Sequence, residues 1–250
     1  MAAREVRILF RKELRQLLRN RGALLTAVFL PILMILLMPM AQILSMSGGR
    51  LHELHLPEGL QLPPGLADLR HEPRAILWFI LTPLVATGCL MCPAVTASYT
   101  FISERETRTL ELLVALPVRV GHILTAKLLA ILALAVPLCL ALLSVDAALV
   151  LSRGLGSPGY VLTLGVMLLT ALACSTSTAL LVSLLARDFR SANNLNGLIL
   201  GPIILGSFAL MTVIPGPTLA AGVLAALYAV AAVITTIMAL RVVTFERLLL

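Results

Sequence analysis

The sequence contains few charged residues and few aromatic ones. Charged side chains make up 12% of the 250 residues and aromatic side chains 4%, whereas hydrophobic residues make up 60%. The charged share is about half of that typical of soluble domains, and the mean hydropathy is +1.03. A water-soluble globule cannot cover that much apolar surface, so the composition excludes soluble, disordered, fibrous and disulfide-stapled proteins. It predicts an integral membrane protein.

The sequence also lacks the motifs of several chemical sites. It contains no GxxxxGK[ST] loop, and its two lysines, Lys12 and Lys127, follow Arg11 and Ala126 rather than glycine. The chain therefore has no usual means of holding the β- and γ-phosphates of ATP. It also has no HExxH or GxSG motif and no paired carboxylates within its apolar runs, which an intramembrane enzyme would need for acid–base chemistry.

Runs without Asp, Glu, Lys or Arg locate the membrane spans, because charge is costly in hydrocarbon. Four such runs are 28, 29, 33 and 50 residues long, and another apolar run has Lys127 near its start and Asp146 near its end. The longest run is too long for one span, because a helix crosses the hydrocarbon with about 20 residues. It is divided by Pro215-Gly216-Pro217, a turn signal. We predict an all-α integral membrane protein with one domain over 1–250 and six transmembrane helices. The predicted spans are 23–45, 75–101, 121–147, 159–186, 195–214 and 218–241.

Basic residues are distributed unevenly between the segments that connect these spans. Six spans place both termini on one side, and 15 of the 19 basic residues lie on that side. The positive-inside rule then makes both termini cytoplasmic, which predicts a multi-pass protein of a prokaryotic plasma (inner) membrane. The net charge of +7 reflects this topology, and no nucleic-acid partner is expected. The four basic residues on the other side are Arg50, Arg70, Arg74 and Arg153.

Residues 1–22, before the first span, have the pattern of an amphipathic helix. Apolar residues recur with helical spacing, and basic residues occupy the opposite face, which only Ile8 and Leu18 interrupt. Such a helix lies in the membrane interface with its apolar face toward the lipid, where each arginine near anionic headgroups gains about 1 kcal/mol. We predict an interfacial elbow helix, either a simple anchor or one that also contacts a cytoplasmic partner. Its polar residues are Arg4, Arg7, Arg11, Lys12, Glu13 and Arg15, and its apolar residues are Val6, Leu9, Phe10, Leu14 and Leu17.

The cytoplasmic loop after the second span is predicted to contain a short charged helix over 102–117. Ser103 and Glu106 have the spacing of a capping box, which starts a helix. Pro117 ends it. The segment is either a solvated loop or a docking surface through which a motor moves the membrane helices.

This loop and the start of the third span contain a characteristic series of residues. A Glu-basic-Glu triplet is followed by Thr-Leu-Glu, by Leu-Leu, by a proline and by a lysine that opens the next span. The series resembles the hallmark of permease subunits of type-2 ATP-binding-cassette (ABC) exporters. Many members have glycine before Thr-Leu-Glu, where this chain has Arg108, so a glycine hinge is absent. The matching residues are Glu104, Arg105, Glu106, Thr109, Leu110, Glu111, Leu112, Leu113, Pro117 and Lys127.

Other segments resemble the same family, so that the resemblance covers nearly the whole chain. Lys12-Glu13-Leu14 resembles its elbow helix, Pro31 lies early in the first span, and Phe245-Glu246-Arg247 resembles its C-terminal tail. Its second cytoplasmic loop is matched by Arg187, Asp188 and Arg190.

The resemblance implies a division of labour between subunits. Two copies of a separate ABC ATPase would bind ATP and Mg²⁺, while two permease copies, identical or homologous, form the substrate path in the lipid. The loop helix, including Arg108, would dock into a groove of each ATPase, and this chain would hold no cofactor and catalyse no reaction. The alternatives are an intramembrane enzyme and a secondary transporter, although the inverted repeats typical of the latter are not evident.

Polar residues inside the spans are candidates for either packing or transport. In the family the second and fifth spans face the axis between two permeases, so their hydroxyl-bearing residues are candidates for the substrate path. The fourth span carries Cys174-Ser175-Thr176-Ser177-Thr178, and such small polar residues let helices approach closely and bond to each other, which predicts a packing role. The path candidates are Thr87, Thr96, Ser207 and Thr212.

No metal site is predicted. Cys89 and Cys92 are three residues apart, but two thiolates without further ligands make a poor site. The four cysteines are therefore interpreted as small core residues. Asp146 is a functional candidate because it is an acid within a span, but a position near the membrane interface is the simpler interpretation. Three histidines of the first outer loop, His52, His55 and His71, do not have the HExxH spacing.

Overall fold

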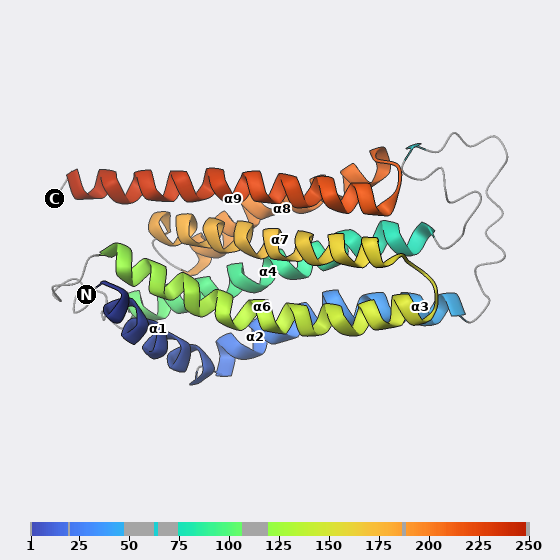
Figure 1. Ribbon diagram of the computed structural model, residues 1–250. Coiled ribbons are helices and arrows are strands. Elements are labelled where there is room, and N and C mark those ends of the chain that lie inside the picture. Colours follow the sequence, from blue (N-terminus) through green and yellow to red (C-terminus); the bar gives the residue numbers. More distant parts are fainter. Residues whose placement is uncertain are drawn as a thin grey trace.

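The computed structural model describes residues 2–19, 21–47, 63–64, 75–106, 120–186 and 189–248. Within these ranges every regular element is a helix, and six helical segments are long and apolar enough to cross a membrane. The predicted all-helical fold with six spans is therefore confirmed (Figure 1). The elements are α1 (Ala2–Arg19), α2 (Arg21–Pro31), the π-helix η1 (Ile32–Leu37), α3 (Met38–Ser47), α4 (Ala75–Glu106), α6 (Val120–Ser152), α7 (Pro158–Leu185), α8 (Phe189–Val213) and α9 (Pro217–Leu248).

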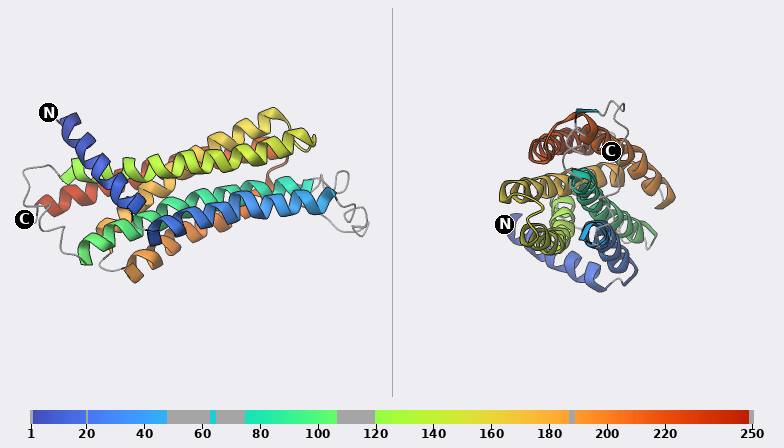
Figure 2. Two further views of the ribbon diagram at one scale, coloured as in Figure 1. Left: turned by 90° about the horizontal axis from the view of Figure 1, so that it is seen from below. Right: turned by 90° about the vertical axis from the view of Figure 1, so that its right-hand side faces the viewer.

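Two helices, α4 and α7, form the centre of the bundle. In each of them 67% of the span residues are buried, against 33% or less in the other spans. The spanning helices run alongside one another, whereas α1 crosses them at an angle (Figure 2). The start of α1, the end of α4, the start of α6 and the end of α9 all lie at the same end of the bundle (Figure 1). We call this the terminal end.

The second span extends further than the sequence predicts. The expected end is residue 101, with a new helix starting at Ser103, whereas α4 continues to Glu106. Ser103 lies inside this helix, so the predicted capping box is wrong. No glycine or proline interrupts the chain from Ala97 to Glu106, and an uninterrupted helix keeps its backbone hydrogen bonds satisfied. The α8 helix likewise begins at Phe189, six residues before the predicted start.

Pro31 divides the first span into α2 and η1. Proline has no N–H, so the carbonyl of Ala27, four residues earlier, receives no backbone hydrogen bond from this position. The thiol of Cys92 in α4 donates to that carbonyl, with an Sγ–O distance of 3.4 Å. At Gly88, also in α4, an added Cβ would lie 2.7 Å from Cγ1 of Ile35. Helix α4 therefore supplies both the missing donor and the space in which η1 approaches it.

The turn between α6 and α7 closes with a Schellman motif. Gly154 has a φ of 62°, a left-handed conformation that glycine adopts readily. Its amide donates to the carbonyl of Leu151 at 3.1 Å. The amide of Leu155 donates to the carbonyl of Val150 at 2.9 Å, which completes the motif. The indole of Trp78 donates to the carbonyl of Leu155 at 2.7 Å, so the turn is tied to α4.

Hydroxyl groups of the fourth span link α7 to its neighbours. Ser175 is fully buried and donates to the carbonyl of Leu90 in α4. Ser177 accepts a hydrogen bond from Thr236 in α9, with an oxygen–oxygen distance of 2.9 Å. The predicted packing role of these serines is confirmed, because both contacts join different helices.

Candidate functional site

The apolar face of α1 packs against the bundle. Phe10, Leu14 and Leu17 form a cluster with small or branched residues of α4, α6 and α7, and Leu17 is only 4% exposed. Neighbouring helices thus cover part of this face, whereas the sequence assigns the whole of it to lipid; Val6, Leu9, Phe10 and Leu14 stay partly exposed. The place of α1 in a membrane interface stays a prediction. The bundle residues of the cluster are Ala97, Ala130, Ile131 and Ala179.

A buried ion pair joins α1 to α6. Glu13 is 2% exposed and Lys127 is 1% exposed, and Oε2 of Glu13 lies 3.9 Å from Nζ of Lys127. The other carboxylate oxygen, Oε1, lies 3.4 Å from Nζ of Lys12, whose side chain is 50% exposed. The carboxylate therefore has one buried and one exposed cationic neighbour.

This pairing is missed when the sequence is considered segment by segment. The sequence pattern assigns Glu13 to the polar side of α1 and Lys127 to the start of a span. A helical projection gives a better signal, because Glu13 is three residues after Phe10 and four before Leu17, on the apolar face. An acid on an apolar face predicts a buried cation opposite it.

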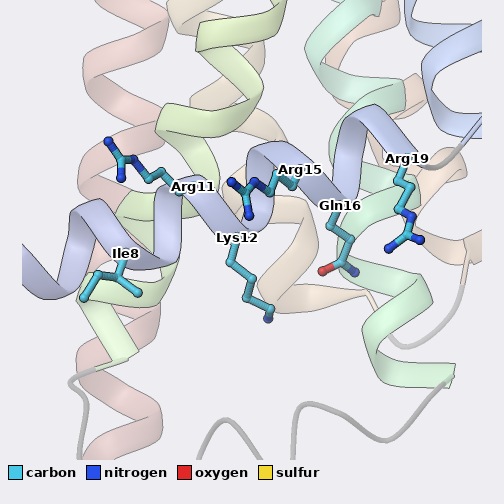
Figure 3. Close-up of a pocket in the computed structure, with 6 residues that line it drawn as sticks. All are labelled: Ile8, Arg11, Lys12, Arg15, Gln16 and Arg19. Carbon is cyan, nitrogen blue, oxygen red and sulfur yellow. The ribbon is translucent and has the colours of Figure 1, made fainter.

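The other face of α1 carries basic residues. Arg7, Arg11 and Arg15 are exposed, and Figure 3 shows Arg11 and Arg15 projecting from α1 while the ribbons of other helices lie behind it. The surface there has a shallow depression of about 620 Å³. The side chain of Arg4 is not among those described. The lining residues are Ile8, Arg11, Lys12, Arg15, Gln16 and Arg19.

Most of the residues assigned to ATPase coupling lie outside the described residues. Arg187 and Asp188 of the second cytoplasmic loop also lie outside them, whereas Arg190 is exposed near the start of α8. Helix α4 ends at the terminal end of the bundle, and α6 begins there (Figure 1). The last residues of α4 are Glu104, Arg105 and Glu106. The coupling residues outside the described ranges are Arg108, Thr109, Leu110, Glu111, Leu113 and Pro117.

The four path candidates differ in exposure. Thr96 and Ser207 are each 1% exposed, and the Ser207 hydroxyl is hydrogen-bonded to that of Tyr228 in α9. Thr87 and Thr212 are partly exposed, and each donates to a carbonyl of its own helix at 2.7 Å. Within one copy of the chain, Thr96 and Ser207 thus contact neighbouring protein groups. The assignment of all four to a substrate path stays a prediction.

Asp146 is buried within α6. Its side chain is 1% exposed, and neither carboxylate oxygen has a hydrogen-bond partner. It therefore lies between helices, six residues before the end of α6, and its position near the membrane interface stays a prediction. No three His, Cys, Asp or Glu side chains in the described part of the chain are arranged to hold a metal ion. The outer-loop histidines His52, His55 and His71 lie outside that part.

Comparison with known protein families gives the class of this chain. A model described as an ABC-2 family transporter protein matches residues 7–215, from the first turns of α1 to the turn after α8. The chain belongs to the ABC-2 transporter family. No curated protein and no solved structure matches the sequence.

Membership of the ABC-2 transporter family decides between the alternatives that the sequence leaves open. This ABC-2 transporter is a multi-pass membrane component and not itself a catalyst, and its family implies association with an ABC ATPase. An intramembrane enzyme and a secondary transporter are therefore disfavoured. The match ends before α9. In the described structure, however, the contact between α7 and α9 is the most extensive contact between two helices, so α9 is part of the same bundle.

Proposed function

We propose that this chain is the transmembrane subunit of an ATP-driven exporter. Two permease copies, identical or homologous, form the substrate path, and two copies of a separate ABC ATPase dock through the segment 102–117. The observation that carries the proposal is the family match over residues 7–215. The six apolar helices agree with it.

The arrangement of α4 and α6 supports docking at the terminal end. The two helices end and begin there (Figure 1), on either side of the proposed docking segment. Helix α4 is also one of the two central helices and continues without a break to Glu106. A force applied to the segment after Glu106 would therefore reach the centre of the bundle through a continuous helix.

The division of the chemistry follows from the residues of the chain. Since the sequence has no GxxxxGK[ST] loop, ATP and Mg²⁺ are assigned to the partner ATPase, whose hydrolysis supplies the energy. This chain would hold no cofactor of its own.

The orientation in the membrane follows from charge. Six spans put 15 of the 19 basic residues on the side of the termini, so we place the terminal end, with both termini, in the cytoplasm of a prokaryotic cell whose inner membrane the chain spans. This places the docking segment on the side where ATP is available.

The first test is co-purification with an ATPase. The chain is co-expressed with the ABC ATPase whose gene lies nearest to its own, and the complex is isolated through a tag on the chain alone. We expect the ATPase to be retained and its turnover to differ from that of the free subunit. Substrate export by the purified chain reconstituted without any nucleotide-binding partner would contradict the proposal.

The second test addresses the docking segment. Replacement of Glu104 and Glu111 by alanine is expected to weaken ATPase retention and to abolish the change in turnover, while membrane insertion stays intact. A matched control replaces Glu53 and Glu58, acids of the predicted outer loop, so that the same charge is removed. Equal ATPase retention by both double variants and the native chain would refute docking through this segment.

A further inference from the structure

Asp146 differs from every other buried polar side chain in the described part of the chain. Its side chain is 1% exposed, and neither carboxylate oxygen has a hydrogen-bond partner. Each of the other buried polar or charged side chains there makes a hydrogen bond or an ion pair. The buried acid Glu13, for example, lies 3.9 Å from Nζ of Lys127. Asp146 is therefore the one buried acid of the described residues whose charge, if present, would have no partner.

The main neighbours of α6 in the described structure offer Asp146 no cation. They are α1, α2, η1, α3, α4 and α7. Among them η1, α3 and α7 contain no charged residue or histidine, the charged residues of α4 are its last three, and those of α1 and α2 precede the first span. Lys127 is 19 residues away along α6, or about 28 Å, and Arg153, seven residues away, is exposed. The remaining titratable side chains on α6 and these helices, none of which bonds to either carboxylate oxygen, are Cys89, Cys92, Tyr99, His122, Cys139, Tyr160 and Cys174.

The surroundings of Asp146 favour the neutral acid. Burial of an unpaired carboxylate costs far more than burial of a neutral carboxyl group, so such a group takes up a proton instead. Leu143 and Val150, on the same face of α6, are 5% and 2% exposed. A Cβ added to Gly156 would lie 2.8 Å from Cγ1 of Val150, so this face is closely packed. A proton is the cation that needs no further room there, whereas an amine or a metal ion would require the helices to separate.

We propose that Asp146 is a proton-binding site that exchanges its proton through the end of the bundle opposite to the terminal end. We call this the distal end; the turn between α6 and α7 lies there (Figure 1). Asp146 is six residues from the last residue of α6, or about 9 Å along the helix axis. When water reaches the carboxyl group, its O–H bond breaks, the proton passes to a water molecule and a carboxylate remains, because hydrated aspartate is ionised at neutral pH. Closure of the distal end reverses the transfer.

A hydrogen bond of Trp78 closes the distal end near Asp146. The indole donates to the carbonyl of Leu155 at 2.7 Å and so ties the turn between α6 and α7 to α4. Its Nε1 lies 4.0 Å from the position of a Cβ on Gly156, and Cγ1 of Val150 lies 2.8 Å from the same position. Since Val150 is one helical turn after Asp146, water that enters past Trp78 has a single turn of α6 to cross. In the exporter proposed above, on which this consequence rests, each opening of the distal end would release the proton on the side away from the ATPase.

Infrared spectroscopy tests the charge state of Asp146 in the full chain without any ATPase. In a neutral detergent, the C=O stretch of a neutral carboxylic acid is separate from the bands of carboxylates. At neutral pH we expect the native chain to show an acid band of about one carboxyl group per chain, because hydrated acids are ionised. In Asp146→Asn this band should be lost. Asp146→Glu keeps a carboxyl group at the same place and should keep the band.

The matched control replaces the other buried acid of the described residues. Glu13 is 2% exposed but is paired with Lys127, so Glu13→Gln should leave the acid band unchanged. Both substitutions exchange a buried acid for its amide, and the two sites differ in whether the acid has a buried cation beside it. An acid band that persists in Asp146→Asn, or that is lost equally in Glu13→Gln, would overturn the proposal. So would a native chain without an acid band, because Asp146 would then be ionised.

Exchange into D2O tests the path of the proton. The acid band shifts as O–H becomes O–D, and the rate of this shift reports the access of water to the carboxyl group. Trp78→Phe removes the indole donor and should speed the shift by about fivefold, the effect of one lost hydrogen bond. The control Asn196→Ala removes a donor to the hydroxyl of Ser98, nearer to the terminal end of α4, and should change the rate by less than about twofold. Equal acceleration by both variants, or none by Trp78→Phe, would overturn exchange through the distal end.

Both infrared tests use the chain alone, which separates this site from ATPase docking. Absence of the acid band would overturn the proton site and leave docking through 102–117 unaffected. Failure of the chain to retain an ATPase would overturn docking and leave the infrared result as it stands. Each proposal can therefore fail without the other.

Discussion

The buried pair of Glu13 and Lys127 allows a quantitative prediction, because Glu13 has two cationic neighbours in different environments. Nζ of Lys127 is 3.9 Å from the carboxylate and 1% exposed, and Nζ of Lys12 is 3.4 Å from it with a side chain that is 50% exposed. Two unit charges at such distances attract by about 4 kcal/mol at an effective dielectric constant near 20. If distance alone set the strength of the attraction, Lys12 would stabilise the carboxylate more than Lys127 does. If burial sets it, Lys127 contributes more.

We expect burial to decide. Lys127→Met leaves the buried carboxylate without its buried partner, which costs about 3–5 kcal/mol. Because Lys12 remains nearby, the lower limit applies. Lys12→Met removes a solvent-screened neighbour and should cost less than about 1 kcal/mol. For a chain of this size a loss of 3 kcal/mol lowers the thermal midpoint by about 6–12 °C.

The four cysteines supply the assay. Cys89, Cys92, Cys139 and Cys174 are all free and buried, so a thiol-reactive dye reports their exposure as the detergent-solubilised chain is heated. The double variant Glu13→Gln/Lys127→Met should be more stable than Lys127→Met alone, because no unpaired charge stays buried. Equal shifts for Lys12→Met and Lys127→Met, or a double variant less stable than either single one, would refute this reasoning.

Three further predictions use the same assay. Cys92→Ala should lose about 1–3 kcal/mol because the Ala27 carbonyl is left without a donor, while Cys92→Ser keeps a donor and should lose less; the reverse order would contradict this role. Gly154→Ala should destabilise the fold by roughly 1 kcal/mol, since the Cβ of alanine crowds the backbone at a positive φ. Gly165→Ala, in mid-helix with open space at its Cβ, should instead stabilise it by a similar amount. Asp146→Asn should keep or raise the thermal midpoint, because neither carboxylate oxygen has a partner to lose; a loss above about 1 kcal/mol would reveal one.

The number of spans could be predicted from the sequence because it depends on a strong and local effect. Charge is excluded from hydrocarbon at a cost of several kcal/mol per residue, so the scarce charged residues mark the ends of helices. The turn at Pro215-Gly216-Pro217 is equally local, and Gly216 indeed has a positive φ of 82°. Both features depend on residues close together in the chain.

The surroundings of α1 could not be predicted in the same way. A helical period shows that α1 has an apolar face, but lipid and protein attract such a face for the same reason. The choice depends on Ala97, Ala130 and Ala179, small residues of three other helices that leave room for Leu17. The contact between Glu13 and Lys127 likewise spans more than 100 residues. No local pattern contains such information.

The extension of α4 past residue 101 is an intermediate case. The charges at 104–106 suggest the end of a membrane span, but a charged helix need not end where the hydrocarbon does. Arg108 in place of glycine is the sequence feature that favours a continuous helix. The sequence thus locates the membrane boundary here better than it locates the end of the helix.

Trp78 is the one tryptophan of the chain, and its indole N–H donates to the carbonyl of Leu155 in the turn between α6 and α7. Its intrinsic fluorescence therefore arises from a single known place, at the end of the bundle opposite to the termini. Indole emission shifts to longer wavelength when the ring becomes hydrated. If the ATPase docks through 102–117 as proposed, nucleotide added to an assembled complex would act at the far end of α4. A change in this emission would then report, without any attached label, that the motion had crossed the bundle.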